Sequence, residues 1–432
     1  MQISAALKSA QAKAAYRIVP LLTIGYFFAS LDRVNVGFAA LQMNKDIGIS
    51  SEVFGFGAGL FFIAYCIFAV PANVIMERVD PRYWIGGVMI AWGTVAACMA
   101  FAQGPVSFSI LRFLVGVAEA GYFPAVILYF TRWFAPNVRA RMVAILMLAL
   151  PLSSVLGSPI SGALLLTDGF LGMRGWHWLF IIEAVPAVIL GFIAFAILPK
   201  DVASARFLDE NEKTAIAESL HTDTATAEKP KFSWKYLLNP TVIALTLVYI
   251  GGTSVTNALS LWQPQIIAAY NLSPLVVGFL NAVPFALGSI AMYFWSSRSD
   301  KKAERRWHTA IPLAVVFLGL LATAFVTGLA PMIAVLCIIV AAASMIKGPF
   351  WGMATERLPK SLSAQGIGTI NALNNLGVFA ATWVIGVVNT QTGSYEFAML
   401  PIAALALIAT ILAVTIGKRT ARKTVEKAPT HV

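Results

Sequence analysis

The feature that most constrains the fold is a series of apolar stretches, each about 20 residues long, the length that crosses a bilayer as a helix. These stretches lie near residues 18–40, 54–76, 83–102, 107–131, 142–166, 177–198, 240–265, 275–297, 308–328, 331–354, 364–389 and 395–416. Charged residues make up only 12% of the 432 residues, whereas an ordinary soluble domain carries about 25%. The pattern predicts an all-α integral membrane protein with twelve transmembrane helices.

One long polar segment divides the twelve stretches into two groups of six. Residues 199–238 are rich in Ala, Thr, Glu and Lys, and they predict a linker that contains a short surface helix over residues 205–220. We therefore expect an N-terminal half at 1–198, a C-terminal half at 239–417 and a polar tail at 418–432. Two hydrophobic halves joined by a linker are typical of transporters built from repeats.

The lysines and arginines predict how the chain is oriented in the membrane. They gather at both termini, in the linker and in every second loop, whereas the opposite side carries only Lys45 and Arg174. Loops rich in Lys and Arg stay in the cytoplasm, so both termini and the linker are expected there. The net charge of +11 therefore reflects topology. The lipid bilayer is the expected partner, and nucleic acid is not.

A few charged residues remain inside the apolar stretches. They are Asp32, Arg33, Arg112, Glu119, Glu183 and Lys347. On insertion scales, one charge at the bilayer centre costs about 2.5–3.5 kcal/mol. Such residues therefore face the interior of a helix bundle or a water-filled cavity, where they mark the path of a substrate or a proton.

Two readings of these charges remain open from the residues alone. Arg112 and Glu119 are seven residues apart, about two helical turns, so they share a helix face. Together with Asp32 and Arg33, they are either structural ion pairs or a site where an anion meets a proton. An acid that is protonated in one state and paired with arginine in another couples proton movement to anion binding. We expect Asp32 and Glu119 to carry protons, and Arg33 and Arg112 to bind the substrate carboxylate or release the acids.

The second half adds a base and several amides. Lys347 either binds an anion or extends its ammonium group toward the cytoplasmic side. Asn371 and Asn375 are four residues apart and share a helix face, where they either bond a neighbouring helix or contact a ligand. Trp351 either packs or lines a pocket. We expect these four residues to contribute to the substrate site.

The sequence contains no sign of catalytic or metal chemistry. Cys66, Cys98 and Cys337 lie inside apolar runs, without the spacing of a disulfide framework or a metal site. The four histidines are scattered, and no nucleophile–base pair or large polar domain is evident. We expect no enzymatic activity, no cofactor and no metal.

Several segments resemble the anion:cation symporter family of the major facilitator superfamily. They include LDRVNVGFA at 31–39, RFLVGVAEAGYFPA at 112–125 and INALNNLG at 370–377. The resemblance implies two six-helix halves that work by alternating access, in a monomer of the bacterial inner membrane. It also implies that Asp32 and Glu119 are protonation sites partnered by Arg33 and Arg112, and that Tyr65, Trp351 and Asn371 contact the substrate.

These observations together predict a proton-coupled symporter that imports an organic carboxylate. Lys347 is followed by Gly348 and Pro349, where similar sugar-acid carriers have hydroxyl residues. This difference favours an aromatic or dicarboxylic acid such as phthalate. A sugar-acid or tartrate-type symporter is the alternative. A drug exporter or proton antiporter is a further one, suggested by LGSPISG at 156–162.

Overall fold

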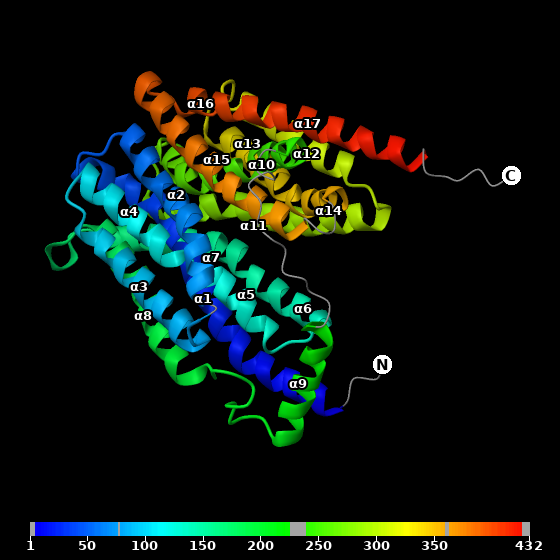
Figure 1. Ribbon diagram of the computed structural model, residues 1–432. Coiled ribbons are helices and arrows are strands. Elements are labelled where there is room, and N and C mark those ends of the chain that lie inside the picture. The colour runs from blue at the N-terminus through cyan, green and yellow to red at the C-terminus, as the bar shows by residue number, and fades with distance from the viewer. Residues whose placement is uncertain (1–4, 77, 225–238, 359–362, 426–432) are drawn as a thin grey trace.

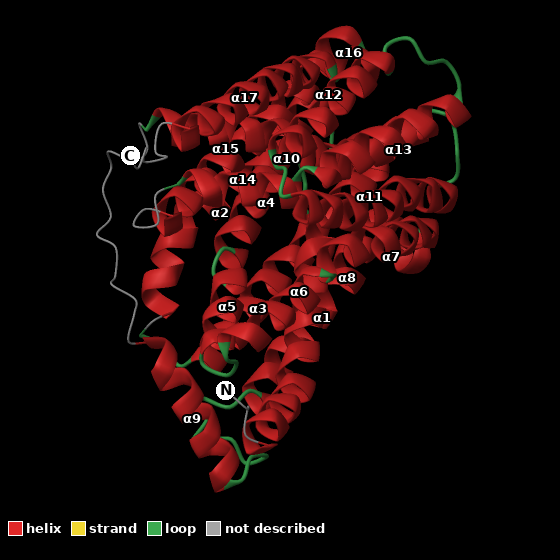
Figure 2. Cartoon of the chain, turned by 90° about the vertical axis from the view of Figure 1, so that its right-hand side faces the viewer, coloured by secondary structure: helices red, strands yellow, loops and turns green. Residues whose placement is uncertain are grey.

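The computed structural model describes residues 5–76, 78–224, 239–358 and 363–425, which are helical apart from loops and turns (Figures 1 and 2). The N-terminal half contains α1 (Ala5–Asp46), α2 (Ser51–Met76), α3 (Pro81–Cys98), α4 (Pro105–Glu119), α5 (Tyr122–Thr131), α6 (Pro136–Met147), α7 (Ala149–Leu164) and α8 (Gly175–Ile197), with short 3₁₀ turns at Met99–Phe101, Leu165–Thr167 and Phe170–Gly172. The linker carries α9 (Glu210–Thr224). The C-terminal half contains α10 (Pro240–Ala268), α11 (Pro274–Lys302), α12 (Arg306–Ala322), α13 (Leu329–Met345), α14 (Lys347–Arg357), α15 (Ser363–Thr392), α16 (Tyr395–Ala398) and α17 (Leu400–Val425).

The predicted membrane spans are confirmed. In the described ranges, eleven helices are long and apolar enough to cross a membrane, and α12 is a shorter apolar helix. The predicted span at 308–328 is too long at its end, because α12 stops at Ala322 and a turn follows. The last helix, α17, continues to Val425, into the segment predicted as a tail. Residues 426–432 of that tail lie outside the described residues.

Apart from the span that begins with the one-turn helix α16, three of the predicted spans are each built from two helices. The breaks fall at residues 120–121, at Leu148 and at Ile346. Each break comes three or four residues before a proline, namely Pro124, Pro151 or Pro349. A proline inside a helix has no N–H for the carbonyl one turn earlier and crowds that carbonyl with its ring, so a helix kinks or breaks there.

The two halves contact each other at the end of the spans opposite the termini, which we call the far end. There Ser158 Oγ of α7 accepts a hydrogen bond from Asn281 Nδ2 of α11 at 2.8 Å. At the same end, Glu52 N of α2 donates to Thr390 Oγ1 of α15 at 2.9 Å. The halves diverge from there toward the labelled N and C termini (Figure 1). The structure is therefore closed at the far end and open on the side of the termini.

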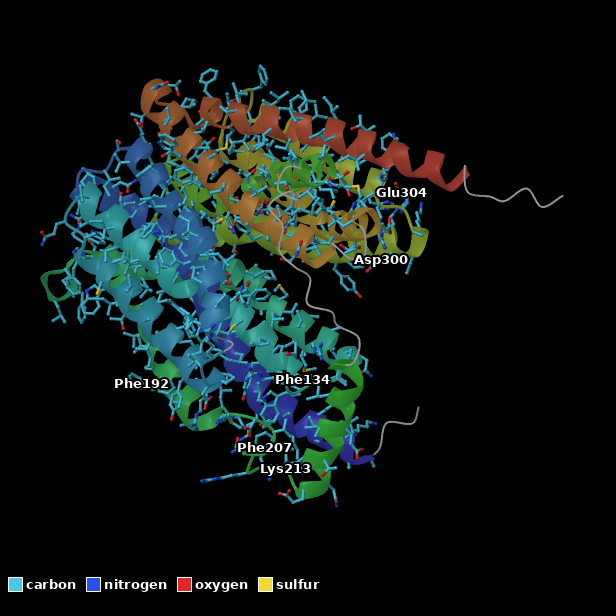
Figure 3. All side chains as sticks on the ribbon, in the orientation of Figure 1. Phe134, Phe192, Phe207, Lys213, Asp300 and Glu304 are labelled. Carbon is cyan, nitrogen blue, oxygen red and sulfur yellow. The ribbon has the colours of Figure 1, made fainter. Side chains whose placement is uncertain are left out.

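The linker helix packs on the N-terminal half, and its bounds differ from the prediction. It begins at Glu210 rather than at 205, because Asp209 and Glu212 cap its first turn. Glu212 N donates to Asp209 Oδ1 at 2.8 Å, and Asp209 N donates to Glu212 Oε2 at 3.1 Å. Just before the helix, Phe207, which Figure 3 labels, stacks on Trp133 with ring centroids 6.0 Å apart.

Candidate functional site

A buried ion pair joins α1 and α4 in the middle of the N-terminal half. Arg33 Nε donates to Glu119 Oε1 at 3.1 Å, and a second nitrogen of the same guanidinium contacts the same oxygen. The Glu119 side chain is 1% exposed, whereas that of Arg33 is 23% exposed. Glu119 Oε2 has no hydrogen-bond partner. The pair thus has a buried acid and a base that is partly accessible.

The ring of Phe61 on α2 lies beside two cations. The guanidinium carbons of Arg33 and Arg112 are 5.3 Å and 5.1 Å from its centroid, and Arg33 is 5.6 Å from the ring of Tyr65. Both arginines therefore make cation–π contacts. Arg112 is 2% exposed and its Nε has no partner. In the described part of the chain it forms no salt bridge, and it interacts electrostatically with Glu119 and Asp32.

Asp32 has a separate environment from Arg33, its neighbour in sequence. Its Oδ2 accepts a hydrogen bond from Trp92 Nε1 of α3 at 3.0 Å, and its Oδ1 accepts one from Asn35 Nδ2 at 3.4 Å. The residue is 3% exposed. Adjacent residues point about 100° apart around a helix, which is why Asp32 faces α3 while Arg33 faces Glu119. The acids of α1 and α4 are thus held by different groups, one by neutral donors and one by a base.

The C-terminal half places a base next to an aromatic cluster. Lys347 is the first residue of α14, and within the described residues it forms no salt bridge. Tyr249 of α10 stacks on Phe350 at 4.6 Å between centroids and contacts the ring of Trp351 at 5.0 Å. Tyr249 also lies within electrostatic range of Tyr26 on α1.

The asparagines of α15 divide into two groups. Asn374 is buried and accepts a hydrogen bond from Thr253 Oγ1 of α10, so its role is helix–helix bonding. Asn375 Nδ2 donates to Asn371 O of its own helix at 3.1 Å, and Asn371 is exposed. Cys66 of α2 contacts the carbonyl of the intervening Ala372 at 3.3 Å. Asn371 and Asn375 are therefore next to the contact between the halves, as a substrate site between the halves requires.

Sequence reasoning missed the aromatic residues that surround the charges. They are Tyr26, Phe61, Trp92 and Tyr249. Helical spacing carried a signal for two of them, because Tyr26 is seven residues before Arg33 and Phe61 is four residues before Tyr65, so each pair shares a helix face. Nothing in the sequence indicated that Trp92 would donate to Asp32, because that contact depends on how α1 and α3 pack.

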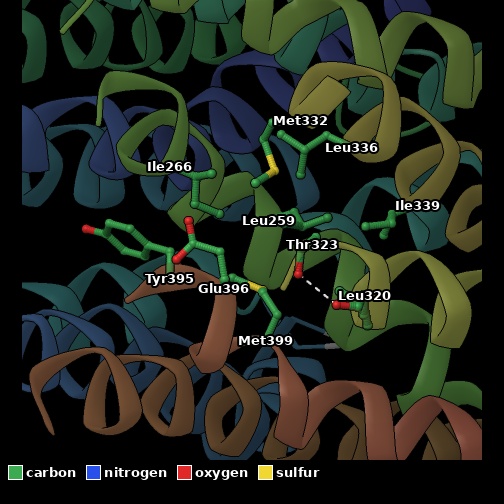
Figure 4. A pocket seen from close by; sticks show the side chains of 10 residues that line it. All are labelled: Leu259, Ile266, Leu320, Thr323, Met332, Leu336, Ile339, Tyr395, Glu396 and Met399. Carbon is green, nitrogen blue, oxygen red and sulfur yellow. Dashed lines mark hydrogen bonds between the residues drawn. The ribbon is translucent and has the colours of Figure 1, made fainter. Parts of the chain in front are cut away.

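A narrow pocket in the C-terminal half is distinct from the charged cluster. Apolar side chains such as Leu259, Leu336 and Met399 line it, together with the carboxylate of Glu396 (Figure 4). It includes no base and none of the residues predicted for the site, so it does not suit an anion. In the described ranges, no group of three or more His, Cys, Asp or Glu side chains is arranged to hold a metal ion.

Comparison with known proteins identifies the relatives of this chain. Residues 22–382 match the model of the Major Facilitator Superfamily. Over 94% of each chain, the sequence is 44% identical to a protein of Agrobacterium vitis named "Putative tartrate transporter". It is 34% identical, over 95% of this chain and 94% of the relative, to "Putative metabolite transport protein NicT" of Pseudomonas putida. A solved bacterial homologue of the human lysosomal transporter Spinster, inward-facing and unoccupied, has a TM-score of 0.78 at 16% identity, covering 94% of this chain and 98% of its own.

Proposed function

The chain belongs to the Major Facilitator Superfamily, and from that premise we propose that it is a proton-coupled symporter that imports a small hydroxylated dicarboxylate of the tartrate class. The sequence alone favoured an aromatic acid and gave a tartrate-type acid as the alternative. The name of the relative at 44% identity supports the tartrate-type acid. The observation that supports an anionic substrate is the environment of Arg112. This residue is buried, forms no salt bridge within the described residues and contacts the same Phe61 ring as Arg33.

A dicarboxylate suits the distribution of unpaired cations. Arg112 lies in the N-terminal half and Lys347 in the C-terminal half, and the described residues offer neither a salt-bridge partner. An arginine fork matches one carboxylate in a bidentate contact, and a lysine ammonium is a point charge for the other. A dianion that contacts both would neutralise the buried Arg112 and the partly buried Lys347 and draw the halves together. Closure around the substrate is the step that alternating access needs.

The ion pair of Arg33 and Glu119 supports coupling to protons. While Glu119 is ionised, its carboxylate occupies the guanidinium of Arg33. A proton on Glu119 would weaken this contact and free Arg33 for the substrate carboxylate, so that proton and anion binding favour each other. Asp32, held by the neutral donors Trp92 and Asn35, is the second acid that carries a proton in this scheme.

The proposal includes an orientation. The Lys and Arg bias places both termini in the cytoplasm, at the inner membrane of a bacterium, with the protein acting as a monomer. With this orientation, the end that is open in the structure faces the cytoplasm and the far end faces outward. The structure then corresponds to the state that releases substrate to the cell.

Uptake by proteoliposomes tests the proposal. Purified protein is reconstituted, an inward proton gradient is imposed, and the entry of labelled L-tartrate is followed with and without a protonophore. We expect accumulation that collapses when the protonophore is added. If labelled phthalate accumulates and labelled tartrate does not, the substrate is an aromatic acid, as the sequence alone favoured. Proton-driven movement of a fluoroquinolone without either acid would establish the antiporter reading.

Glu119→Gln tests the coupling in the same vesicles. We expect it to abolish gradient-driven accumulation while leaving exchange of labelled for unlabelled substrate partly intact, because exchange needs no proton release. Glu396→Gln is the matched control, since Glu396 lines the separate pocket of the C-terminal half. Undiminished accumulation by Glu119→Gln would refute this assignment of the proton.

A further inference from the structure

One buried acid has no part in the scheme above. Glu183 of α8 is 2% exposed. Its Oε1 accepts a hydrogen bond from Ser161 Oγ of α7 at 2.7 Å, and its Oε2 has no partner. In the part of the chain that the structure describes, it forms no salt bridge. A carboxylate in such a place is costly unless it is paired or protonated, and Ser161 offers it one neutral donor.

Asn35 connects Glu183 to Asp32. Its Nδ2 donates to Asp32 Oδ1 at 3.4 Å, and its side chain lies within electrostatic range of the Glu183 carboxyl. Asn35 is 1% exposed and its Oδ1 has no partner. A primary amide has two N–H donors, so Asn35 is able to support whichever of the two carboxyls is ionised. Two acids and one amide thus form a polar chain from α1 to α8 inside the membrane-spanning bundle.

This chain leads from Asp32 toward the far end. Gly175, the first residue of α8, and Asp46, the last of α1, are at that end, where Trp176 Nε1 donates to Asp46 Oδ2 at 2.8 Å. At 1.5 Å per residue, Glu183 is about 12 Å along its helix from this end, and Asp32 is about 21 Å along α1. Glu183 is therefore the outer acid of the pair.

Glu183 is also close to the contact that closes the far end. Ser158 is three residues before Ser161 on α7, and it accepts the hydrogen bond of Asn281 from the opposite half. Opening this contact would bring solvent to the part of α7 whose Ser161 binds Glu183.

No base faces Glu183 from the described helices that pack against α8. From α1, Asp32 is the titratable group that interacts with it. From α7 the polar contact is Ser161, and α7 has no titratable residue. The titratable groups of α3 are Arg82 and Tyr83 in its first turn and Cys98 at its last residue. The 3₁₀ turns Met99–Phe101 and Leu165–Thr167 have none.

We propose that Glu183 is a further proton-carrying acid, which takes its proton from the far side when the halves open there and transfers it to Asp32. The proton leaves the Glu183 carboxyl and binds the Asp32 carboxylate, so the pair holds one proton and one negative charge before and after. Asn35, which donates to Asp32 and lies near Glu183, is the positioning residue between the two acids. The inference rests on the proposed function, because it supplies the proton that the symport step uses.

Transport by Glu183→Gln is the first test. In proteoliposomes with an inward proton gradient, we expect its initial rate of tartrate accumulation to fall about tenfold or more, while exchange of labelled for unlabelled tartrate stays within about twofold of wild type. Glu183→Asp, which retains the carboxyl, is expected to recover part of the accumulation. Glu396→Gln again serves as the matched control. If Glu183→Gln and Glu183→Asp both abolish exchange, Glu183 is structural and the inference is overturned.

An infrared measurement separates this inference from the proposed function. The carbonyl band of protonated carboxyl groups is recorded without substrate, at several pH values, for wild type and Glu183→Gln. We expect Glu183→Gln to lack one component of that band. If this component is missing while wild type does not accumulate tartrate, the proposed function fails and the proton on Glu183 stands. If the band and the accumulation both match wild type, Glu183 carries no proton and the inference is overturned.

Discussion

At the scale of single residues, Phe61 explains how the buried Arg112 and the partly buried Arg33 coexist near each other. Both guanidinium groups face its ring, at 5.3 Å and 5.1 Å, and each such contact is worth about 0.5–2 kcal/mol. Arg33 is also neutralised by Glu119, whereas Arg112 has no salt bridge in the described residues. The ring therefore offsets part of the energetic cost of burying the Arg112 charge. It also orients both guanidinium groups for the proposed anion.

We expect Phe61→Leu to raise the KM for tartrate about threefold to tenfold, because both guanidinium groups lose the face that orients them. The measurement is the initial rate of uptake at several tartrate concentrations. Phe62→Leu is the matched control, since Phe62 is the next residue on α2, is also buried and makes no cation–π contact within the described residues. Equal KM values for the two variants would contradict the role of Phe61.

At the scale of elements, α9 is fastened to the first helix of the N-terminal half. Glu212 accepts a hydrogen bond from Ser9 at 2.7 Å and forms a salt bridge with Lys13 at 2.7 Å. The side chain of Glu212 is only 4% exposed, although it belongs to the linker. Arg17 lies over the ring of Phe207 at 5.3 Å. Contacts of α9 with α1 thus hold the first part of the linker to the N-terminal half.

The contact of α9 with α1 is expected to depend on pH. The hydrogen bond from Lys13, followed by that from Ser9, holds the pKa of Glu212 below its ordinary value of 4.5. A lowered carboxyl pKa contributes stability above the ordinary value, and this stability is lost as the pH falls through the lowered one. Hydrogen exchange of α9, corrected for intrinsic rates, should therefore be slow at neutral pH and rise progressively below about pH 4.5.

Glu212→Gln should speed exchange in α9 already at neutral pH, because the amide cannot form the salt bridge to Lys13. Glutamine at this position still caps the helix, so the change isolates the contact with α1. Glu210→Gln is the matched control, since Glu210 is exposed and pairs only with Lys213 of its own helix among the described residues. Slow exchange in Glu212→Gln at neutral pH would show that other contacts hold α9.

At the scale of the whole molecule, several glycines permit the halves to meet at the far end, and Gly278 and Gly162 are two of them. A Cβ at Gly278 of α11 would lie 2.5 Å from the carbonyl oxygen of Ser158, and one at Gly162 of the other half would lie 2.4 Å from that of Pro274. Both clashes involve backbone, which cannot turn aside as a side chain does. Close backbone approach at these glycines therefore closes this end together with the side-chain hydrogen bonds.

We expect Gly278→Ala to favour the state that is open at the far end and to slow tartrate accumulation about tenfold, a cost of about 1.4 kcal/mol. Spin labels on α7 and α11 should report a longer distance between the helices there. Gly87→Ala on α3 is the matched control, because a Cβ at Gly87 meets no atom within 4 Å. A label distance and rate equal to those of Gly87→Ala would rule out this role for Gly278.

The sequence by itself determined the membrane spans and which charges are inside them, because hydrophobicity and helix length are local properties that the bilayer selects directly. It also determined that α4 presents Arg112 and Glu119 on one face, since helical spacing is local as well. The structure changed two predicted bounds, those of the linker helix at 205–220 and the end of the ninth span. Capping and turn residues, rather than average composition, determine where these helices begin and end.

Only the tertiary structure decided which acid meets which base. From the sequence, an ion pair between Arg112 and Glu119 was possible. In the structure, Glu119 binds Arg33, 86 residues away along the chain. Asp32 binds Trp92 rather than Arg33. Such choices depend on how each helix is rotated and how closely it packs, which no local pattern records. Long-range packing thus left Arg112 without a salt bridge in the described chain, and that unpaired charge is the basis of the proposed anion site.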